Sequence, residues 1–304
     1  RSPNAHPARH QPVFRMACCH VCLHVHVNFD GVNVCSTEPS YHKPRHKKIP
    51  NPRRKMVACL KSTILTSDET PMTLQIDDLQ FGYAGSGGFR LRVPSLTLKA
   101  GTTCLLLGPS GSGKSTFLSL LAGVLTPERG RIALAGQDMS QLSGARMDKF
   151  RGTHIGFIYQ TLNLIPWLST RENIALGLAF APQRRARLSA GVADTITDFM
   201  TRLDLDAGTL GDQPAGLLSL GQQQRVAAAR ALVGAPDLVL ADEPSSALDA
   251  VNTEKFFDLL MAGLDRQRQV LLVVSHDARL APRFDRVINM ADLTGAPKMG
   301  DMSR

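Results

Sequence analysis

Long hydrophobic runs are missing from this 304-residue chain, in which no stretch approaches 18 uninterrupted apolar residues. A transmembrane helix needs about that length, so we expect any membrane-spanning part of an assembly to lie on another chain. No internal repeat is visible. Hydrophobic residues still make up 43% of the sequence, which is normal for a globular core, and the length suits one or two domains.

Most of the chain also lacks an excess of either charge. The formal net charge is +9, but residues 1–71 hold 11 Lys and Arg against 4 Asp and Glu, whereas residues 72–304 hold 24 against 22. The basic character therefore belongs to the N-terminal segment. We expect no nucleic-acid partner.

Cysteine and histidine are scarce beyond residue 71. Five of six cysteines and seven of nine histidines lie within residues 1–71. A metal site is one interpretation, but a second Cys-x-x-Cys pair is missing, and the apolar run at 21–27 is too short and too polar for a signal peptide. The candidate ligands would be Cys19, Cys22, His24 and His26. We expect residues 1–71 to be a disordered or wrongly translated leader, ahead of a domain that spans residues 72–304.

A glycine-rich loop follows the first strongly apolar run after this segment. Residues 108–116 read GPSGSGKST and fit the phosphate-binding pattern. Glycines let backbone N–H groups approach phosphate oxygens, Lys114 supplies a positive charge and Ser115 offers a hydroxyl to Mg²⁺. The run at 103–107 predicts a strand and residues 114–121 a helix, which argues against a chance match. The candidate phosphate ligands are Gly108, Pro109, Ser110, Gly111, Ser112, Gly113, Lys114, Ser115 and Thr116.

Two further apolar runs end in groups suited to catalysis. Residues 238–241 precede Asp242 and Glu243, and residues 270–274 precede His276. In parallel sheets, ligands bind outside the carboxyl ends of the strands. We therefore expect Asp242 to hold Mg²⁺, Glu243 to act as general base and His276 to lie at the same edge. The alternatives are a solvated acidic turn and a structural histidine.

A helix start carries the third polar group. Ser219, Gly221 and Gln222 open a strongly helical stretch, and such a start presents a hydroxyl and backbone N–H groups to an anion. A plain helix N-cap at Ser219 is the alternative. One chain is not expected to use both this helix start and the glycine-rich loop on a single phosphate.

Taken together, residues 72–293 resemble the nucleotide-binding subunit of ABC transporters. Residues 108–116 resemble the Walker A loop, residues 218–222 (LSLGQ) the signature and residues 238–244 (LVLADEP) Walker B. Gln160, at the end of another apolar run, resembles the Q-loop glutamine, Asp249 ends a D-loop-like SALD, and His276 resembles the switch histidine. Tyr83 is placed like the aromatic residue that stacks on adenine.

This resemblance implies an α/β fold of the P-loop NTPase class: a mainly parallel core sheet, an N-terminal antiparallel β subdomain and a helical subdomain at about 161–217. It implies ATP and Mg²⁺ as cofactors, with Ser115, Asp242 and Gln160 at the metal. It also implies a head-to-tail dimer, in which Ser219 and Gly221 of one copy close over the nucleotide of the other. Leu220 departs from the glycine usual at its position, and we expect this to slow closure rather than abolish it.

A closer resemblance is to the subgroup that includes LolD, MacB and FtsE, carried by residues 155–174 and 243–249. It implies a separate permease of the FtsX or MacB type, at the cytoplasmic face of the inner membrane. The expected function is ATP hydrolysis that powers export or lipoprotein release. The alternative is an FtsE-like regulatory module that transports nothing.

Local patterns predict the remaining elements. Strands are expected at 72–76, 89–93, 96–98 and 131–134, a turn at 85–88, and helices at 171–180 and 188–203. Trp167 is expected to pack inside the helical segment. The basic run at 184–187 is expected to lie on a solvated face.

Overall fold

The computed structural model describes residues 72–83 and 89–294, together with four short strands between residues 16 and 33. Contacts divide the chain into Arg1–Leu65 and Thr66–Arg304. In the first unit β1 (Met16–Cys18) pairs with β2 (Val21–Leu23), and β3 (His26–Asn28) pairs with β4 (Gly31–Asn33), both antiparallel. The side chains proposed as metal ligands and the turn at 85–88 lie outside the described residues. The leader stays a prediction.

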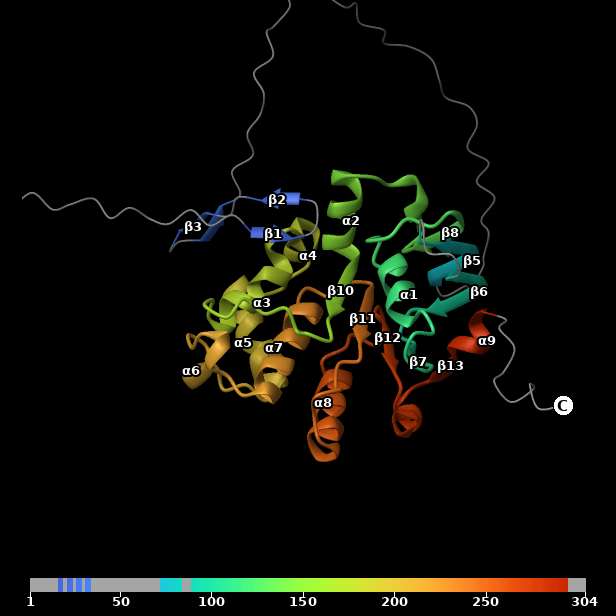
Figure 1. Ribbon diagram of the computed structural model, residues 1–304. Helices are drawn as coiled ribbons and strands as arrows, with labels where there is room; N and C mark the ends of the chain where they lie inside the picture. The colour runs from blue at the N-terminus through green and yellow to red at the C-terminus, as the bar shows by residue number, and fades with distance from the viewer. Residues whose placement is uncertain are drawn as a thin grey trace, which may run out of the picture. The chain divides into compact units, whose positions relative to one another are not determined.

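A five-stranded parallel sheet forms the centre of the second unit, in the order β10-β11-β12-β7-β13 (Figure 1). Its strands are β7 (Thr103–Leu107), β10 (Ile155–Ile158), β11 (Leu238–Asp242), β12 (Val270–Ser275) and β13 (Arg286–Asn289). Each strand runs parallel to its neighbours. The carboxyl ends therefore meet at one edge, as the sequence predicted.

A second, antiparallel sheet has the order β6-β5-β8-β9. Its strands are β5 (Met72–Gly82), β6 (Arg90–Lys99), β8 (Arg129–Leu134) and β9 (Gln137–Asp138). The two strands expected at 89–93 and 96–98 are one strand, β6, which continues through Pro94. Because β6 lies at the edge of the sheet, the missing N–H of Pro94 breaks no ladder.

Helices cover both faces of the parallel sheet. In Figure 1, α1 and the antiparallel sheet lie on one side of it, and the helices from α3 to α7 gather on the other. The α-helices are α1 (Lys114–Leu121), α2 (Ala145–His154), α3 (Thr170–Ala179), α4 (Pro182–Ala186), α5 (Val192–Arg202), α6 (Ala207–Leu210), α7 (Leu220–Leu232), α8 (Ala250–Ala262) and α9 (Met290–Thr294). The described residues also form the 3-10 turns η1 (Met139–Gln141), η2 (Ala215–Leu217) and η3 (Ala278–Arg283).

Strand β11 shows how the sheet separates two hydrophobic clusters. Leu238 and Leu240 point into a cluster with α1 and the antiparallel sheet. Val239 and Ala241 point into a cluster with α3, α5, α7 and α8. Side chains alternate between the faces of a strand, so a strand that is apolar throughout is buried on both faces. The core thus fixes the register of the residues at its carboxyl end.

One expectation about the helical segment is wrong, and a second is wrong for Arg184 alone, because Arg185 and Arg187 of the basic run are exposed as expected. Trp167 is 71% exposed and does not pack inside it, whereas Arg184 of the basic run is only 2% exposed. Within the ranges described, no helix combines the length and the apolarity that crossing a membrane requires.

Candidate functional site

The glycine-rich loop lies between β7 and α1, as predicted. Gly111 and Gly113 have φ of 79° and 94°, a conformation that favours glycine. The ammonium of Lys114 donates to the carbonyl oxygens of Gly108 (2.7 Å) and Pro109 (2.9 Å). A Cβ on Gly108 would lie 2.9 Å from Ser112 Oγ. The loop is therefore a tight cradle with its lysine folded across it.

One polar atom in the cradle has no partner within the chain. Ser112 Oγ is buried and makes no hydrogen bond in the described structure. Buried polar groups are nearly always hydrogen-bonded. An unsatisfied hydroxyl beside glycine amides and Lys114 fits an anionic ligand, and the cradle therefore fits the phosphates of a nucleotide.

Asp242 ends β11 and faces this loop. Burial raises its pKa, helped by the nearby charge of Glu243, and the hydrogen bond with Ser115 and the charge of Lys114 only partly oppose this. A half-buried carboxylate that pairs with a hydroxyl is suited to a cation. Among the residues described, no cluster of three or more His, Cys, Asp or Glu could hold a metal. The Asp242 carboxylate and the Ser115 hydroxyl are oxygen ligands of the kind that Mg²⁺ takes together with phosphate and water oxygens.

Glu243 and His276 come together at the same edge. His276 Nδ1 lies 2.6 Å from Glu243 Oε2, and the backbone N–H of Glu243 donates to the Val274 carbonyl at 3.0 Å. Glu243 has φ of 46°, which costs a non-glycine residue about 1–2 kcal/mol. Its side chain is 15% exposed and that of His276 is 63% exposed. The histidine thus holds a strained, sheltered carboxylate that is well placed to take a proton from water.

Gln160 lies two residues beyond the end of β10, at the same edge, and is exposed. The loop around it is closed by the amide of Leu162, which donates to the Tyr159 carbonyl at 3.0 Å. Because β10 pairs with β11, Gln160 lies at the edge of the sheet where β11 ends in Asp242.

Tyr83 lies beside the start of α1. Its hydroxyl is 3.2 Å from Thr116 Oγ1, and its ring packs edge-on against Phe81 with centroids 4.9 Å apart. The residue is 44% exposed. An aromatic ring fixed next to the cradle and open to solvent suits a stacked base.

Ser219, Gly221 and Gln222 stand apart from this cluster. Ser219 caps α7, accepting from the Gln222 amide at 3.3 Å, while Gln222 Oε1 accepts from the Ser219 amide at 2.9 Å. The interpretation of Ser219 as a helix N-cap is thus correct. A Cβ on Gly221 would meet no atom within 4 Å, so its own chain does not require glycine there. In the described part of the chain, no hydrogen bond or ion pair joins these residues to residues 108–116.

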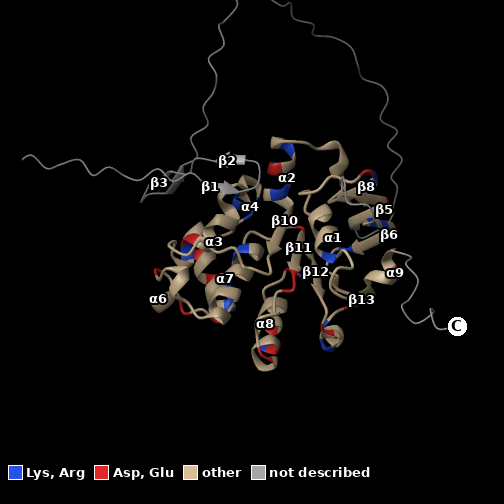
Figure 2. Cartoon of the chain, in the orientation of Figure 1, with Lys and Arg blue, Asp and Glu red and all other residues tan. Residues whose placement is uncertain are grey.

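Asp249 also lies away from the cradle, as the N-cap of α8. It accepts from the Asn252 amide at 2.8 Å. That backbone hydrogen bond is the main reason why its pKa is held below the usual value. Figure 2 shows acidic positions between β11 and α8 and a basic one at the start of α1.

Two residues of α7 reach the site and were missed in the sequence. Gln224 Nε2 donates to the Pro244 carbonyl at 3.1 Å, directly after Glu243, and Arg230 donates to the loop after Gln160. The acceptors of both side chains are backbone carbonyls, which every residue has, so the sequence does not indicate these contacts. Only their position in a helix that begins at the signature-like segment pointed towards them.

Comparisons with known proteins agree with this geometry. The family "ABC transporter" matches residues 91–246. The lipoprotein-releasing system ATP-binding protein LolD of Anaeromyxobacter dehalogenans is 41% identical over 197 residues, covering 65% of this chain and 80% of that protein. The uncharacterized ABC transporter ATP-binding protein Rv0073 of Mycobacterium tuberculosis is 40% identical over 220 residues, covering 71% of this chain. The chain spans 64% of that relative's length.

A solved structure supports the same assignment of the fold. It is the dimeric, post-hydrolysis state of the ATP-binding cassette MJ0796, bound to ADP and Pi. The chain is 30% identical to it with a TM-score of 0.61, over 73% of this chain and 95% of that one. The predicted P-loop NTPase fold of ABC type is confirmed.

Proposed function

The chain belongs to the ATP-binding family of ABC transporters, and we propose that it hydrolyses ATP to power a separate membrane permease. The observation that carries this proposal is the contact between His276 and Glu243, 2.6 Å long, at the sheet edge that also holds the cradle. A phosphate-binding loop alone would support binding only. A sheltered carboxylate with an orienting histidine supports hydrolysis.

In this proposal each residue has a distinct role. The amides of residues 108–116 and Lys114 bind the phosphates, and Tyr83 stacks on the base. Ser115, Asp242 and Gln160 would hold Mg²⁺, which would neutralise charge on the phosphates.

Glu243 accepts a proton from the attacking water. His276, which already contacts it, holds the carboxylate in place and faces the terminal phosphate. Burial destabilises the ionised form of Asp242, as its raised pKa shows. A cation bound there would stabilise that form, so cation binding is favourable.

The remaining predicted residues suit a second copy of the chain. In the described residues no hydrogen bond or ion pair joins Ser219, Gly221 or Gln222 to the cradle of their own chain, and a Cβ on Gly221 would face open space. A head-to-tail dimer would place them over the partner copy's nucleotide, with Asp249 near the dimer axis. Leu220 is 45% exposed at the first position of α7, so its side chain would point into that interface and slow its closure.

An exposed apolar surface supports a permease partner. Trp167 and Leu217 are each 71% exposed. They lie on neighbouring segments, because the Gly216 amide donates to the Pro166 carbonyl at 2.9 Å. Exposed tryptophan is a typical interface anchor. We propose that this surface docks a permease of the FtsX or MacB type, which would place the chain at the cytoplasmic face of the inner membrane.

The test measures phosphate release by the full chain with Mg²⁺ and ATP, beside Glu243→Gln and Leu220→Gly variants. Wild type should hydrolyse. Glu243→Gln should lose about 100-fold or more in kcat and elute as an ATP-dependent dimer in size-exclusion chromatography. Leu220→Gly should hydrolyse faster than wild type. If neither wild type nor Leu220→Gly hydrolyses or dimerises, the proposal is wrong.

A further inference from the structure

We infer that Arg230 is a positioning residue that fixes the Gln160 loop to α7. It would tie the reactive edge of its own chain to the helix whose first residues face a second copy. This inference rests on the function proposed above.

The loop after Gln160 has a conformation that needs support. Leu162 and Asn163 have φ of 59° and 47°, two consecutive left-handed residues, neither of them glycine. Asparagine adopts this conformation more readily than most residues, but it is sterically unfavourable for a bulky residue such as leucine. Gln160 stands in the turn closed by the Leu162 amide and the Tyr159 carbonyl. The direction of Gln160 therefore depends on the contacts that hold Leu162 and Asn163.

Arg230 supplies that hold with two separate donors. Nη1 donates to the Asn163 carbonyl and Nη2 to the Leu162 carbonyl, each at 2.6 Å. The acceptors are thus the carbonyls of the two left-handed residues. A guanidinium is planar and offers its donors in a fixed fork, so it fixes the direction of both carbonyls at once. A lysine ammonium in its place would lack this fork.

A second anchor holds the loop from inside the protein. The Leu162 side chain is 6% exposed and lies in the hydrophobic cluster that also contains Val226 and Ala227 of α7. The loop is therefore held to α7 both by its backbone and by a side chain. Any shift of α7 must carry Leu162 and Asn163 with it.

Helix α7 is well placed to connect two sites. It begins after its N-cap Ser219, and Arg230 lies in its last turn, about 16 Å away along the axis. Between them Gln224, which is 3% exposed, contacts the Pro244 carbonyl next to Glu243. A displacement at the Ser219 end would thus reach Gln160 through Arg230.

The test uses the full chain with Arg230→Ala, Arg230→Lys and a control, Arg202→Ala, which removes an exposed arginine that pairs with Asp198 in α5. Amide hydrogen exchange of residues 159–163 is measured without nucleotide. Arg230→Ala should exchange about tenfold faster there, Arg230→Lys to an intermediate extent and Arg202→Ala as wild type. Wild-type exchange in Arg230→Ala, or full protection in Arg230→Lys, would overturn the inference.

The kinetic arm separates positioning from general support of the fold. Arg230→Ala should lower kcat about tenfold, leave KM for ATP within about twofold and raise the Mg²⁺ concentration needed for half-maximal rate. In a Gln160→Ala background the same change should cost less than about twofold, because both variants remove one effect. Equal losses in both backgrounds would overturn the inference. If wild type does not hydrolyse ATP, the proposed function fails, and the exchange measurement still decides the role of Arg230. If Arg230→Ala does not fold, Arg230→Lys decides alone.

Discussion

The two ends of strand β11 carry aspartates with opposite surroundings. At Asp237, before the strand, burial would raise the pKa, but the hydrogen bond from His154 and the charge of Arg268 outweigh it, so the pKa is lowered. At Asp242, which ends the strand, burial and the charge of Glu243 prevail, and the pKa is raised. Cationic and hydrogen-bonding side chains of the same chain stabilise the Asp237 carboxylate. The Asp242 carboxylate is not stabilised to the same extent, so a bound cation would stabilise it.

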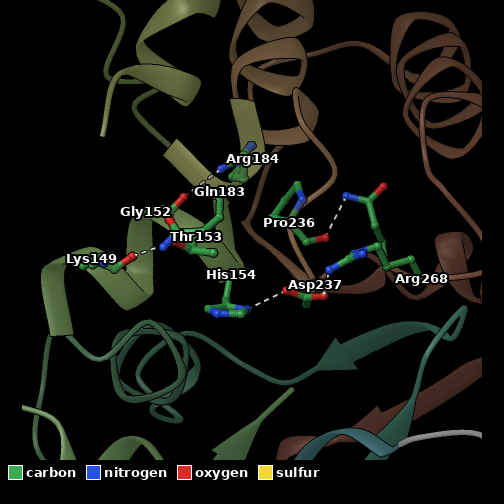
Figure 3. Close-up of polar contacts among 10 residues, drawn as sticks. Lys149, Gly152, Thr153, His154, Gln183, Arg184, Pro236, Asp237 and Arg268 are labelled. Atoms are coloured by element: carbon green, nitrogen blue, oxygen red, sulfur yellow. Dashed lines mark hydrogen bonds and ion pairs between the residues drawn. The ribbon is translucent and has the colours of Figure 1, made fainter. Parts of the chain in front are cut away.

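The same contrast extends along both edges of the sheet. At the amino edge, Asp237 accepts from Arg268 at 2.8 Å and lies 2.6 Å from His154 Nδ1 (Figure 3). Gln269 donates to the Pro236 carbonyl at 3.0 Å. Arg184, from α4, donates to the carbonyls of Gly152, Ala231 and Val233. Each of these side chains therefore has at least one partner within the chain, although the Nε atoms of Arg184 and Arg268 are buried without one among the described residues.

The carboxyl edge is arranged differently. Among the described residues Ser112 Oγ lacks a partner, the Lys114 ammonium donates to two carbonyl oxygens, and His276 pairs with Glu243. The paired charges at the amino edge support the fold, whereas an unpartnered hydroxyl in a glycine-rich loop, beside an exposed histidine–carboxylate pair, indicates where a ligand binds. Substitutions at the two edges should therefore separate stability from activity.

The largest expected effect comes from Asp242→Asn, compared with Asp237→Asn. Asp242→Asn should lower kcat about 100-fold or more, because the Mg²⁺ ligand is lost, yet the ligand-free chain should unfold at the same urea concentration as wild type or a higher one. Asp237→Asn should do the reverse, costing about 1–3 kcal/mol of unfolding free energy with little change in kcat. Phosphate release measures kcat of both variants, and urea denaturation measures their unfolding free energy. Loss of activity without loss of stability in Asp237→Asn would break the comparison.

Next in size is Arg184→Met, with Arg185→Met as the matched control. Arg184 is 2% exposed, and its loss leaves buried carbonyls without a donor, which should cost about 2–4 kcal/mol. Arg185 is exposed on the same short helix, so its replacement should stay within about 0.5 kcal/mol. Urea denaturation gives both values. Equal effects of the two substitutions would show that the buried contacts of Arg184 contribute nothing.

A smaller effect is expected in the pH dependence of stability. Because the pKa of Asp237 is lower in the folded state, its contribution is complete above the unfolded value of about 4 and is lost as the pH falls through the folded one. Asp237→Asn should therefore flatten the decline of stability below pH 4, by at most about 1.4 kcal/mol per pH unit, the value for one proton. Urea midpoints measured from about pH 5 down into the acid range below about pH 4 measure it. An unchanged slope would contradict the proposed pairing with His154 and Arg268.

The sequence predicted the carboxyl edge far better than the amino edge. The residues from Gly108 to Ser115, together with Asp242, Glu243 and His276, follow apolar strands, and their spacing predicts the edge where they meet. A site that binds a ligand needs particular residue types at particular spacings, and that pattern can be recognised in the sequence. The strand ends also fix where these residues lie, so the core and the site were predicted together.

The roles of Arg184 and Arg230 left no such pattern. Arg184 lies in a basic run, RRAR, which is typical of a solvated face, but its acceptors are backbone carbonyls from three separate places: Gly152, Ala231 and Val233. A carbonyl has the same chemistry at every residue, so the sequence cannot indicate which one an arginine reaches. Trp167 was misjudged for a related reason, since its exposure depends on how residues 166–168 pair with residues 214–216.

The smallest expected effect concerns Tyr83, which lies between the two classes of residue. Its hydroxyl is already bound to Thr116 at 3.2 Å, as at the amino edge, while its ring is 44% exposed, as at the carboxyl edge. If the ring is the functional part, Tyr83→Ala should raise KM for ATP about fivefold to tenfold, the equivalent of about 1 kcal/mol of stacking. Tyr83→Phe keeps the ring and should change KM by less than about twofold. Initial rates over a range of ATP concentrations separate the two, and equal increases in KM would assign the role to the hydroxyl. A hydroxyl that positions Thr116 would place Tyr83 with the residues satisfied inside the chain.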